Sequence, residues 1–252
     1  MTDELCRLSA IDAVARLRSG DVTPLDLIDA VERRASAVNG AINALVTPAY
    51  DRARAHARRL MALPPAERGL LAGLPVGIKD LNDVAGVRTT YGSPIFAGNV
   101  PAVSDLIVQT IESNGGIIVG MTNTPEFGAG ANTFNPVFGE TLNPWNPALN
   151  AGGSSGGSAA ALATGIVALA TGSDLGGSLR TPASFCSVVG FRPSPGRVAA
   201  GPGVQRFEDL SVEGPMARTV ADAALFLDAM TGWRIEDPIS RPAPPEPFLT
   251  VA

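Results

Sequence analysis

The sequence contains very few of the side chains that usually activate nucleophiles or bind metals. It has a single histidine, His56, and a single lysine, Lys79, whereas every other basic residue is an arginine. Its two cysteines, Cys6 and Cys186, are too few for a disulfide framework or a four-cysteine zinc site. With one histidine there is also no pair of histidines at metal-binding spacing, so we expect no metal.

Charge and hydropathy argue against several classes of partner. The formal net charge is −5 and no basic stripe is visible, so we do not expect nucleic acid to bind directly. The longest weakly polar run, 157–171, is too short to span a membrane. The acidic N-terminus lacks the apolar region of a signal peptide. Since 45% of the residues are hydrophobic, the chain can bury a large core. We predict a soluble, reduced, cytoplasmic protein.

Residues 1–70 are predicted to form a helical region. Ser9 and Thr23 are typical N-caps, and Gly20 and Gly40 are typical helix ends. These signals predict helices over 10–19, 24–40 and 49–63, with a short strand over 44–47. On the third helix His56 shares the polar face with arginines, so we expect a surface histidine without a catalytic role.

From residue 71 to 235 short apolar strands alternate with helices. This pattern is typical of an α/β fold, and we predict a catalytic core with a mixed sheet flanked by helices on both faces. The expected strands span 75–79, 117–121 and 166–171, and the expected helices span 104–114, 159–164 and 219–230. The proline-rich residues 236–252 predict an extended linker.

The glycine–serine run 152–158 contains the pattern G-x-S-x-G twice, centred on Ser154 and Ser155. A nucleophile elbow of this kind needs a histidine downstream, but His56 lies upstream. A phosphate-binding loop needs an adjacent lysine, and Lys79 is far away in the sequence. The run leads directly into an alanine-rich helix, which argues against a flexible linker.

A second loop, Asp174-Leu-Gly-Gly-Ser178, has the composition of an oxyanion-binding turn. Its two glycines allow consecutive backbone amides to turn toward one point. Ser178 is therefore a candidate nucleophile, and with histidine excluded its base must be a carboxylate or Lys79. Lowering the pKa of a lysine to about 7–8 requires about 3–5 kcal/mol, which burial among the apolar residues 75–78 can supply. Strand alternation sends Asp80 to the opposite face.

Three ordered motifs resemble the amidase signature family of serine hydrolases: Gly77-Ile-Lys-Asp80, the run 152–158, and Asp174-Leu-Gly-Gly-Ser-Leu-Arg180. Three further segments are similar to that family, namely Thr122-Asn-Thr-Pro-Glu-Phe127, Asn143-Pro-Trp145 and Gly190-Phe-Arg-Pro193. The resemblance implies the amidase signature fold over the whole chain as a single domain. It also implies hydrolysis of a small amide to an acid and ammonia or an amine, without a cofactor.

The same resemblance implies a Ser–Ser–Lys triad. Ser178 would attack the amide carbonyl and form an acyl-enzyme. Ser154, which follows a cis peptide bond in the family, would relay the proton from Ser178 to Lys79.

The resemblance also suggests roles around the triad. The backbone amides of Leu175, Gly176, Gly177 and Ser178 would form the oxyanion hole. Ser155 is expected to make a supporting hydrogen bond around the triad, while Asp174 and Arg180 are expected to shape the turn.

Members of this family are considerably longer than 252 residues. We therefore interpret the chain as the N-terminal portion of a longer member, or as one that depends on a second polypeptide for its missing half. Alone it should expose a strand edge and apolar surface, which favours oligomers or low solubility. Two other functions stay open: the glutaminase subunit of a tRNA amidotransferase, and a catalytically inactive binding or assembly module.

Overall fold

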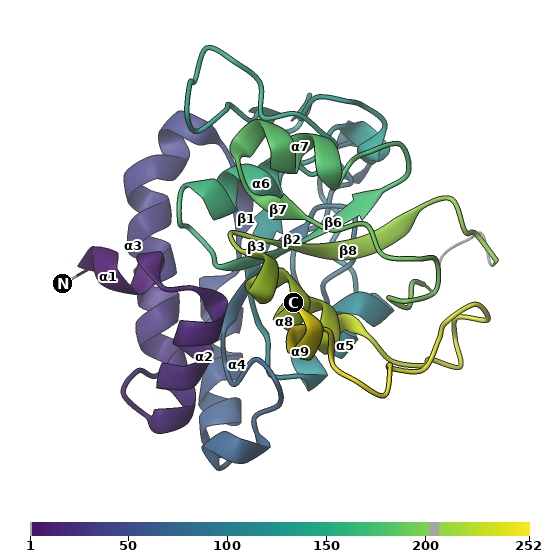
Figure 1. Ribbon diagram of the computed structural model, residues 1–252. Coiled ribbons are helices and arrows are strands. Elements are labelled where there is room, and N and C mark those ends of the chain that lie inside the picture. The colour runs from purple at the N-terminus through teal and green to yellow at the C-terminus, as the bar shows by residue number, and fades with distance from the viewer. Residues whose placement is uncertain (1, 202–206) are drawn as a thin grey trace.

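A six-stranded mixed sheet forms the centre of the computed structural model, which describes residues 2–201 and 207–252 (Figure 1). The strands of this sheet are β1 (Leu45–Pro48), β2 (Pro75–Lys79), β3 (Ile117–Thr122), β6 (Leu169–Asp174), β7 (Val189–Gly190) and β8 (Val212–Ala217). Their order is β1-β3-β2-β6-β8-β7, with β2 parallel to both of its neighbours and the other pairs antiparallel. A separate small hairpin pairs β4 (Phe134–Asn135) with β5 (Gly139–Glu140).

Helices cover both faces of this sheet. They are α1 (Thr2–Arg7), α2 (Ala10–Ser19), α3 (Pro24–Ile42), α4 (Tyr50–Met61), α5 (Leu106–Ser113), α6 (Gly156–Ala163), α7 (Arg180–Cys186), α8 (Val220–Met230) and α9 (Phe248–Val251). The buried side chains of α2, α5 and α8 share one core cluster with Ile118 of β3, whereas those of α4, α6 and α7 share a second cluster with Ile117. The alternation along β3 thus separates the two layers. The predicted α/β fold with a mixed sheet between helices is confirmed.

The N-terminal helices begin where the capping residues predict. The side chain of Ser9 accepts a hydrogen bond from the Asp12 amide, and Thr23 forms a reciprocal capping box with Asp26. The predicted end of the second helix at Gly40 is wrong. The helix continues to Ile42 and ends at Asn43, which adopts the left-handed conformation (φ 56°). Asparagine tolerates that conformation better than most residues.

The strand predicted over 166–171 begins and ends three residues later, as β6. The cause is its antiparallel pairing with β8, which runs without interruption from Leu169 opposite Ala217 to Asp174 opposite Val212. Ser173 and Asp174, which the sequence places in a loop, therefore lie in the sheet and are buried.

The prediction of an extended linker over 236–252 is wrong, because the segment packs back on the body of the protein. The Asp237 side chain accepts a hydrogen bond from the Ala200 amide, and the Arg241 amide donates to the carbonyl of Gly196. The carboxylate of Asp228 on α8 then accepts the first two amides of α9, at 2.8 and 3.0 Å.

The prediction that His56 is a surface residue is also wrong. Its side chain is 14% exposed, and Nδ1 lies 3.5 Å from Oε1 of Glu112. The same oxygen accepts a hydrogen bond from Nη1 of Arg52 at 2.7 Å. Glu112 of α5 thus lies beside both Arg52 and His56 of α4, and His56 makes no hydrogen bond with Lys79 or Ser154 in the described part of the chain.

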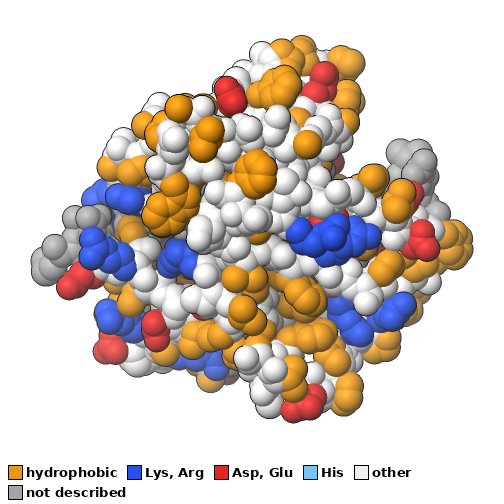
Figure 2. Space-filling view, turned by 45° about the horizontal axis from the view of Figure 1, so that its top comes forward, with side chains coloured by type: hydrophobic (Ala, Val, Ile, Leu, Met, Phe, Trp, Pro, Cys, Tyr) orange, Lys and Arg blue, Asp and Glu red, His pale blue; other side chains and the backbone are white. Residues whose placement is uncertain are grey.

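Several large apolar side chains remain on the surface, as the sequence predicts. Trp145, Trp233 and Ile235 are 69%, 60% and 78% exposed, and apolar side chains are spread over the face shown in Figure 2. The sheet ends at β7, which has only two residues. None of the helices formed by the described residues has the length and apolar character needed to cross a membrane.

The close approach of α6 to β3 depends on Gly157. A Cβ atom at this position would lie 2.2 Å from the backbone nitrogen of Asn123. We expect Gly157→Ala to lower the free energy of unfolding by about 1–3 kcal/mol, because neither backbone can move without disturbing the sheet. Urea unfolding measures this difference.

Gly40→Ala is the matched control, since Gly40 lies inside α3 with open space around its missing side chain. It should raise the free energy of unfolding by about 0.5–1 kcal/mol. Equal stability of the two variants would contradict the assigned helix–strand contact.

Candidate active site

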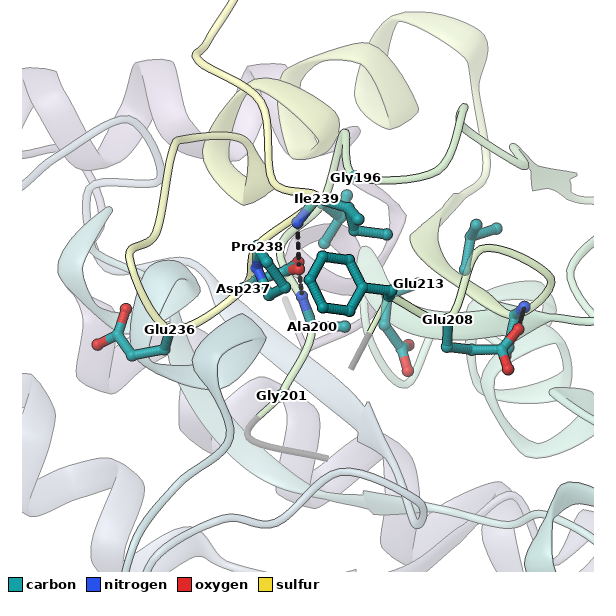
Figure 3. A pocket seen from close by; sticks show the side chains of 13 residues that line it. Gly196, Ala200, Gly201, Glu208, Glu213, Glu236, Asp237, Pro238 and Ile239 are labelled. Carbon is teal, nitrogen blue, oxygen red and sulfur yellow. Dashed lines mark hydrogen bonds between the residues drawn. The ribbon is translucent and has the colours of Figure 1, made fainter. Parts of the chain in front are cut away.

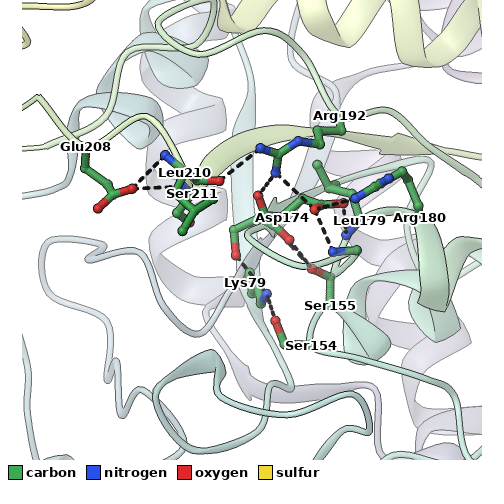
Figure 4. A network of polar contacts seen from close by, with 12 residues as sticks. Lys79, Ser154, Ser155, Asp174, Leu179, Arg180, Arg192, Glu208, Leu210 and Ser211 are labelled. Carbon is green, nitrogen blue, oxygen red and sulfur yellow. Dashed lines mark hydrogen bonds and ion pairs between the residues drawn. The ribbon is translucent and has the colours of Figure 1, made fainter.

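Lys79 lies at the end of β2, between β3 and β6, and is completely buried. Its backbone amide donates to Oγ1 of Thr171 at 2.9 Å. Its Nζ donates to Oγ of Ser154 at 2.6 Å and to Oγ of Ser173 at 2.9 Å. The contact between Lys79 and Ser154 is visible in Figure 4. The ammonium group is therefore surrounded by hydroxyl groups, and no carboxylate of the described residues forms an ion pair with it.

The environment of Lys79 favours its neutral form. Burial lowers the pKa of Lys79 from its ordinary value, because the charged amine loses its water, while the carboxylates of Glu213 and Asp174 act in the opposite direction. Asp80 does not share this pocket, since its carboxylate accepts hydrogen bonds from the amide and hydroxyl of Thr90. The carboxylate of Asp80 therefore does not stabilise the protonated form of Lys79.

Ser154 lies in the loop that precedes α6. The peptide bond between Gly153 and Ser154 is cis, as the family resemblance implies. A Cβ atom on Gly153 would lie 2.9 Å from the backbone of Asn132, so the loop has room only for glycine at that position. The sequence motif thus reflects close packing around the hydroxyl that contacts Lys79.

Ser155 connects the two candidate loops to the sheet. Its hydroxyl accepts a hydrogen bond from the Ser173 amide at 3.3 Å and donates to the Ser173 carbonyl at 3.4 Å. Its own amide donates to the carbonyl of Ser178 at 3.3 Å. Ser155 therefore holds the backbone of Ser178 next to the loop that carries Ser154.

Asp174 organises the turn that carries Ser178. Its carboxylate accepts the amides of Gly177 and Leu179 at 2.8 and 3.1 Å. It also forms ion pairs with Arg180 and Arg192, each with a nitrogen–oxygen distance of 3.0 Å (Figure 4). Burial alone would raise the pKa of Asp174, but Arg180 and the two amides hold it at about 2.

The predicted oxyanion hole needs one correction. The amide of Gly177 is directed at Asp174, so this donor is not available to an oxyanion. Gly177 has a φ of 121°, which few other residues adopt, and this conformation lets the chain reverse around the carboxylate. The amides of Leu175, Gly176 and Ser178 make no hydrogen bond among the described residues, and open space lies beside Gly176.

The structure brings Lys79 and Ser154 into direct contact, and the backbone carbonyl of Ser178 accepts a hydrogen bond from the amide of Ser155, the residue after Ser154. The hydroxyl of Ser178 itself makes no hydrogen bond within the part of the chain that the structure describes. It is partly exposed, as an attacking group must be.

Sequence reasoning missed Ser173, Arg192 and Glu213. Ser173 could have been found from strand alternation, because it shares a face of β6 with Thr171, which also contacts Lys79. Arg192 belongs to a segment that resembles the family but received no role. No sequence feature marked Glu213 as a site residue, because a single acidic residue in a strand usually faces solvent.

Several known proteins are similar to this chain. The profile of the family described as Amidase matches residues 26–251. A putative amidase from Synechocystis sp. is 39% identical over 99% of this chain and 50% of its own length. A glutamyl-tRNA(Gln) amidotransferase subunit from Anaeromyxobacter sp. strain K is also 39% identical, over 98% of this chain and 50% of its own length.

Among solved structures, 6-aminohexanoate cyclic dimer hydrolase is similar with a TM-score of 0.89 and 34% identity. The similarity covers 98% of this chain and 50% of the hydrolase. The chain thus spans about half the length of the relatives it matches. The matched family profile covers most of the chain. Within it, Lys79 at the end of β2 contacts Ser154, and Ser178 lies in the turn that follows the neighbouring strand β6. The chain therefore belongs to the amidase family.

Proposed function

We propose that this chain carries the catalytic core of a serine hydrolase that cleaves carboxylic amides. The observation that supports this most directly is the fully buried Lys79 amine, 2.6 Å from the Ser154 hydroxyl. A lysine can act as a general base only when it is neutral, and burial provides that condition. No histidine lies in this site, so the amine replaces the imidazole of more familiar serine hydrolases.

In the first step the Ser178 hydroxyl attacks the amide carbonyl carbon. Its proton passes to the Ser154 oxygen while the proton of Ser154 passes to Nζ of Lys79. The carbonyl oxygen gains the negative charge, and the amides of Leu175, Gly176 and Ser178, which have no hydrogen-bond partner among the described residues, would stabilise it. Charge-directed amides of this kind often contribute the largest part of the rate enhancement.

In the second step the carbon–nitrogen bond breaks and the leaving nitrogen takes a proton. That proton comes from the Lys79 ammonium through Ser154, so the base that accepted it also returns it. The product is an ester on Ser178 together with ammonia or an amine. A water molecule then attacks the ester, gives its proton to the same relay, and releases the acid as Ser178 regains its hydrogen.

Ser173 contributes to this relay by fixing the lysine. Its hydroxyl accepts a second hydrogen bond from Nζ of Lys79, at 2.9 Å, and Ser173 is held in turn by Ser155. Two acceptors at fixed positions restrict the rotation of the amine. When Lys79 is neutral, Nζ can keep its hydrogen bond to Ser173 while its lone pair accepts the hydrogen bond of the Ser154 hydroxyl, so the direction of the Lys79–Ser154 bond reverses.

The glutaminase function follows the same chemistry, with the side-chain amide of glutamine as the substrate. The similarity to a tRNA amidotransferase makes this a second candidate. Ammonia release from glutamine that requires added partner subunits would assign the glutaminase function. Hydrolysis of simple amides by the chain itself would assign the free-standing amidase function instead.

We expect Ser178 to react covalently with a fluorophosphonate probe, because an activated serine hydroxyl attacks phosphorus as it attacks a carbonyl. Ser178→Ala should abolish the labelling, which in-gel fluorescence or intact mass measures. Ser184→Ala, a change of an exposed serine on α7, should leave labelling intact.

Labelling that survives in Ser178→Ala would exclude Ser178 as the nucleophile. A wild-type chain that is folded but does not react would favour the inactive binding or assembly module.

The rate of labelling should rise with pH until Lys79 is neutral, with a midpoint below the ordinary lysine pKa of about 10.4. Lys79→Ala should reduce the rate at neutral pH by about 10²–10⁴-fold, the usual contribution of a general base. The loss should become smaller at high pH, where hydroxide can replace the amine. Stopped labelling reactions at several pH values give these rates.

Lys79→Arg is the matched variant, because arginine retains the positive charge but does not release its proton. It should be as slow as Lys79→Ala at neutral pH. A wild-type rate in the arginine variant would show that charge, and not proton acceptance, is the function of Lys79.

A further inference from the structure

Glu213 is an acidic residue of β8 that the proposed mechanism does not use. Its Cα lies directly opposite that of Ser173 in the antiparallel pairing of β8 with β6. Directly opposed residues project from the same face, with Cβ atoms about 5 Å apart. Glu213 is therefore the cross-strand neighbour of the residue that accepts a hydrogen bond from Lys79.

The carboxylate of Glu213 is only partly satisfied. Its Oε1 accepts a hydrogen bond from the side-chain nitrogen Nδ2 of Asn82 at 3.3 Å. The backbone amide of Asn82 donates to the backbone carbonyl of Lys79 at 3.0 Å. Its Oε2 is buried and has no hydrogen-bond partner among the described residues. A buried carboxylate oxygen without a partner lowers stability, and it leaves the charge of Glu213 only partly compensated by hydrogen bonds.

The other acids near Lys79 and Glu213 already have partners, which are cations for Asp174 and neutral groups for Asp80 and Asp105. Asp174 is neutralised by Arg180 and Arg192, and Asp80 is bound by Thr90. Asp105, which also faces Glu213, accepts the amide of Asp83. Of the two acids whose charges act on Lys79, Asp174 is ion-paired with Arg180 and Arg192, whereas Glu213 has no ion pair within the described residues. Consistent with this, burial raises the pKa of Glu213 while Lys79 lowers it.

Glu213 also has access to space that can hold water. It lines a cavity of about 160 Å³, together with Glu208, Glu236 and Asp237 (Figure 3). A cavity of this size has room for several water molecules.

We propose that Glu213 is a positioning residue of the relay, whose carboxylate sets how readily the Lys79 amine holds a proton. The role in catalysis rests on the proposed function, because it matters only if Lys79 is the base. A negative charge at Glu213 stabilises the Lys79 ammonium. The acid thus fixes the pH at which Lys79 becomes neutral, and the two groups titrate as a coupled pair.

The single lysine of this sequence allows a direct test. In protein labelled with ¹³C at lysine Cε, the Lys79 signal reports its own protonation without any need for activity. Glu213→Gln removes the charge at nearly constant volume and should lower the Lys79 titration midpoint by about one pH unit. Glu213→Asp keeps the charge and should restore a midpoint near that of the wild type.

Glu236→Gln is the matched control, since it removes an acid from another wall of the same cavity, where the side chain is 44% exposed. The titration midpoint of Lys79 in Glu236→Gln should equal that in the wild type. A midpoint in Glu213→Gln that is unchanged or higher would overturn the proposal. If Glu213→Gln does not fold, the Lys79 titration is measured in Glu213→Ala, which removes the same charge with a smaller side chain.

Labelling of Ser178 gives the second readout. Below the wild-type midpoint Glu213→Gln should label faster, by about tenfold for a shift of one pH unit. A wild-type chain that does not label would count against the proposed function, while the lysine titration would still decide the role of Glu213. A shifted titration with an unshifted labelling profile would show that Glu213 acts on Lys79 but that Lys79 is not the base.

Discussion

The burial of Lys79 is the constraint on which the rest of the site depends. An ammonium group removed from water is strongly destabilised unless it finds a partner charge or loses its proton. Here its two acceptors are the hydroxyls of Ser154 and Ser173, which provide no compensating charge. The central position of β2 in the sheet makes this possible, because strands on both sides exclude water from the end where Lys79 lies. The fold thus converts a residue that is normally a surface cation into a potential base.

The second requirement is a turn that stays in place while its amides remain available. Asp174 meets this requirement because it is part of β6, and so it is fixed by the sheet before the turn begins. Its carboxylate binds one amide within the turn and one just beyond Ser178. The amides of Leu175 and Gly176 before the first anchor, and of Ser178 between the two, make no hydrogen bond among the described residues. A turn held at both ends in this way can present donors to a developing negative charge with little reorganisation.

Much of this site could be predicted from the sequence, because its key residues lie in short motifs. Lys79 follows an apolar strand, and Ser178 lies in a glycine-rich loop with few structural alternatives. Glu213 lies beside Ser173 only because β8 pairs with β6 in one particular register. The register between two strands that are distant in the sequence cannot be predicted from the residues of either strand alone. The wrong predictions for His56 and 236–252 have the same origin, since α5 covers the histidine and α8 binds the first amides of α9. Short sequence patterns therefore predicted the positions of the helices and strands well, but they predicted less well which residues pack against each other in the fold.

The arginines and the lysine of this site have different roles. Arginine remains protonated at all ordinary pH values, so the ion pairs of Arg180 and Arg192 with Asp174 do not change as the pH changes. The turn that carries the candidate nucleophile is therefore held by permanent charges. Lysine and glutamate can both change protonation when they are buried, and both Lys79 and Glu213 lie where burial shifts their pKa toward neutrality. Lys79 and Glu213 can thus change protonation near neutral pH, while the ion pairs of Asp174 beside them keep a constant charge.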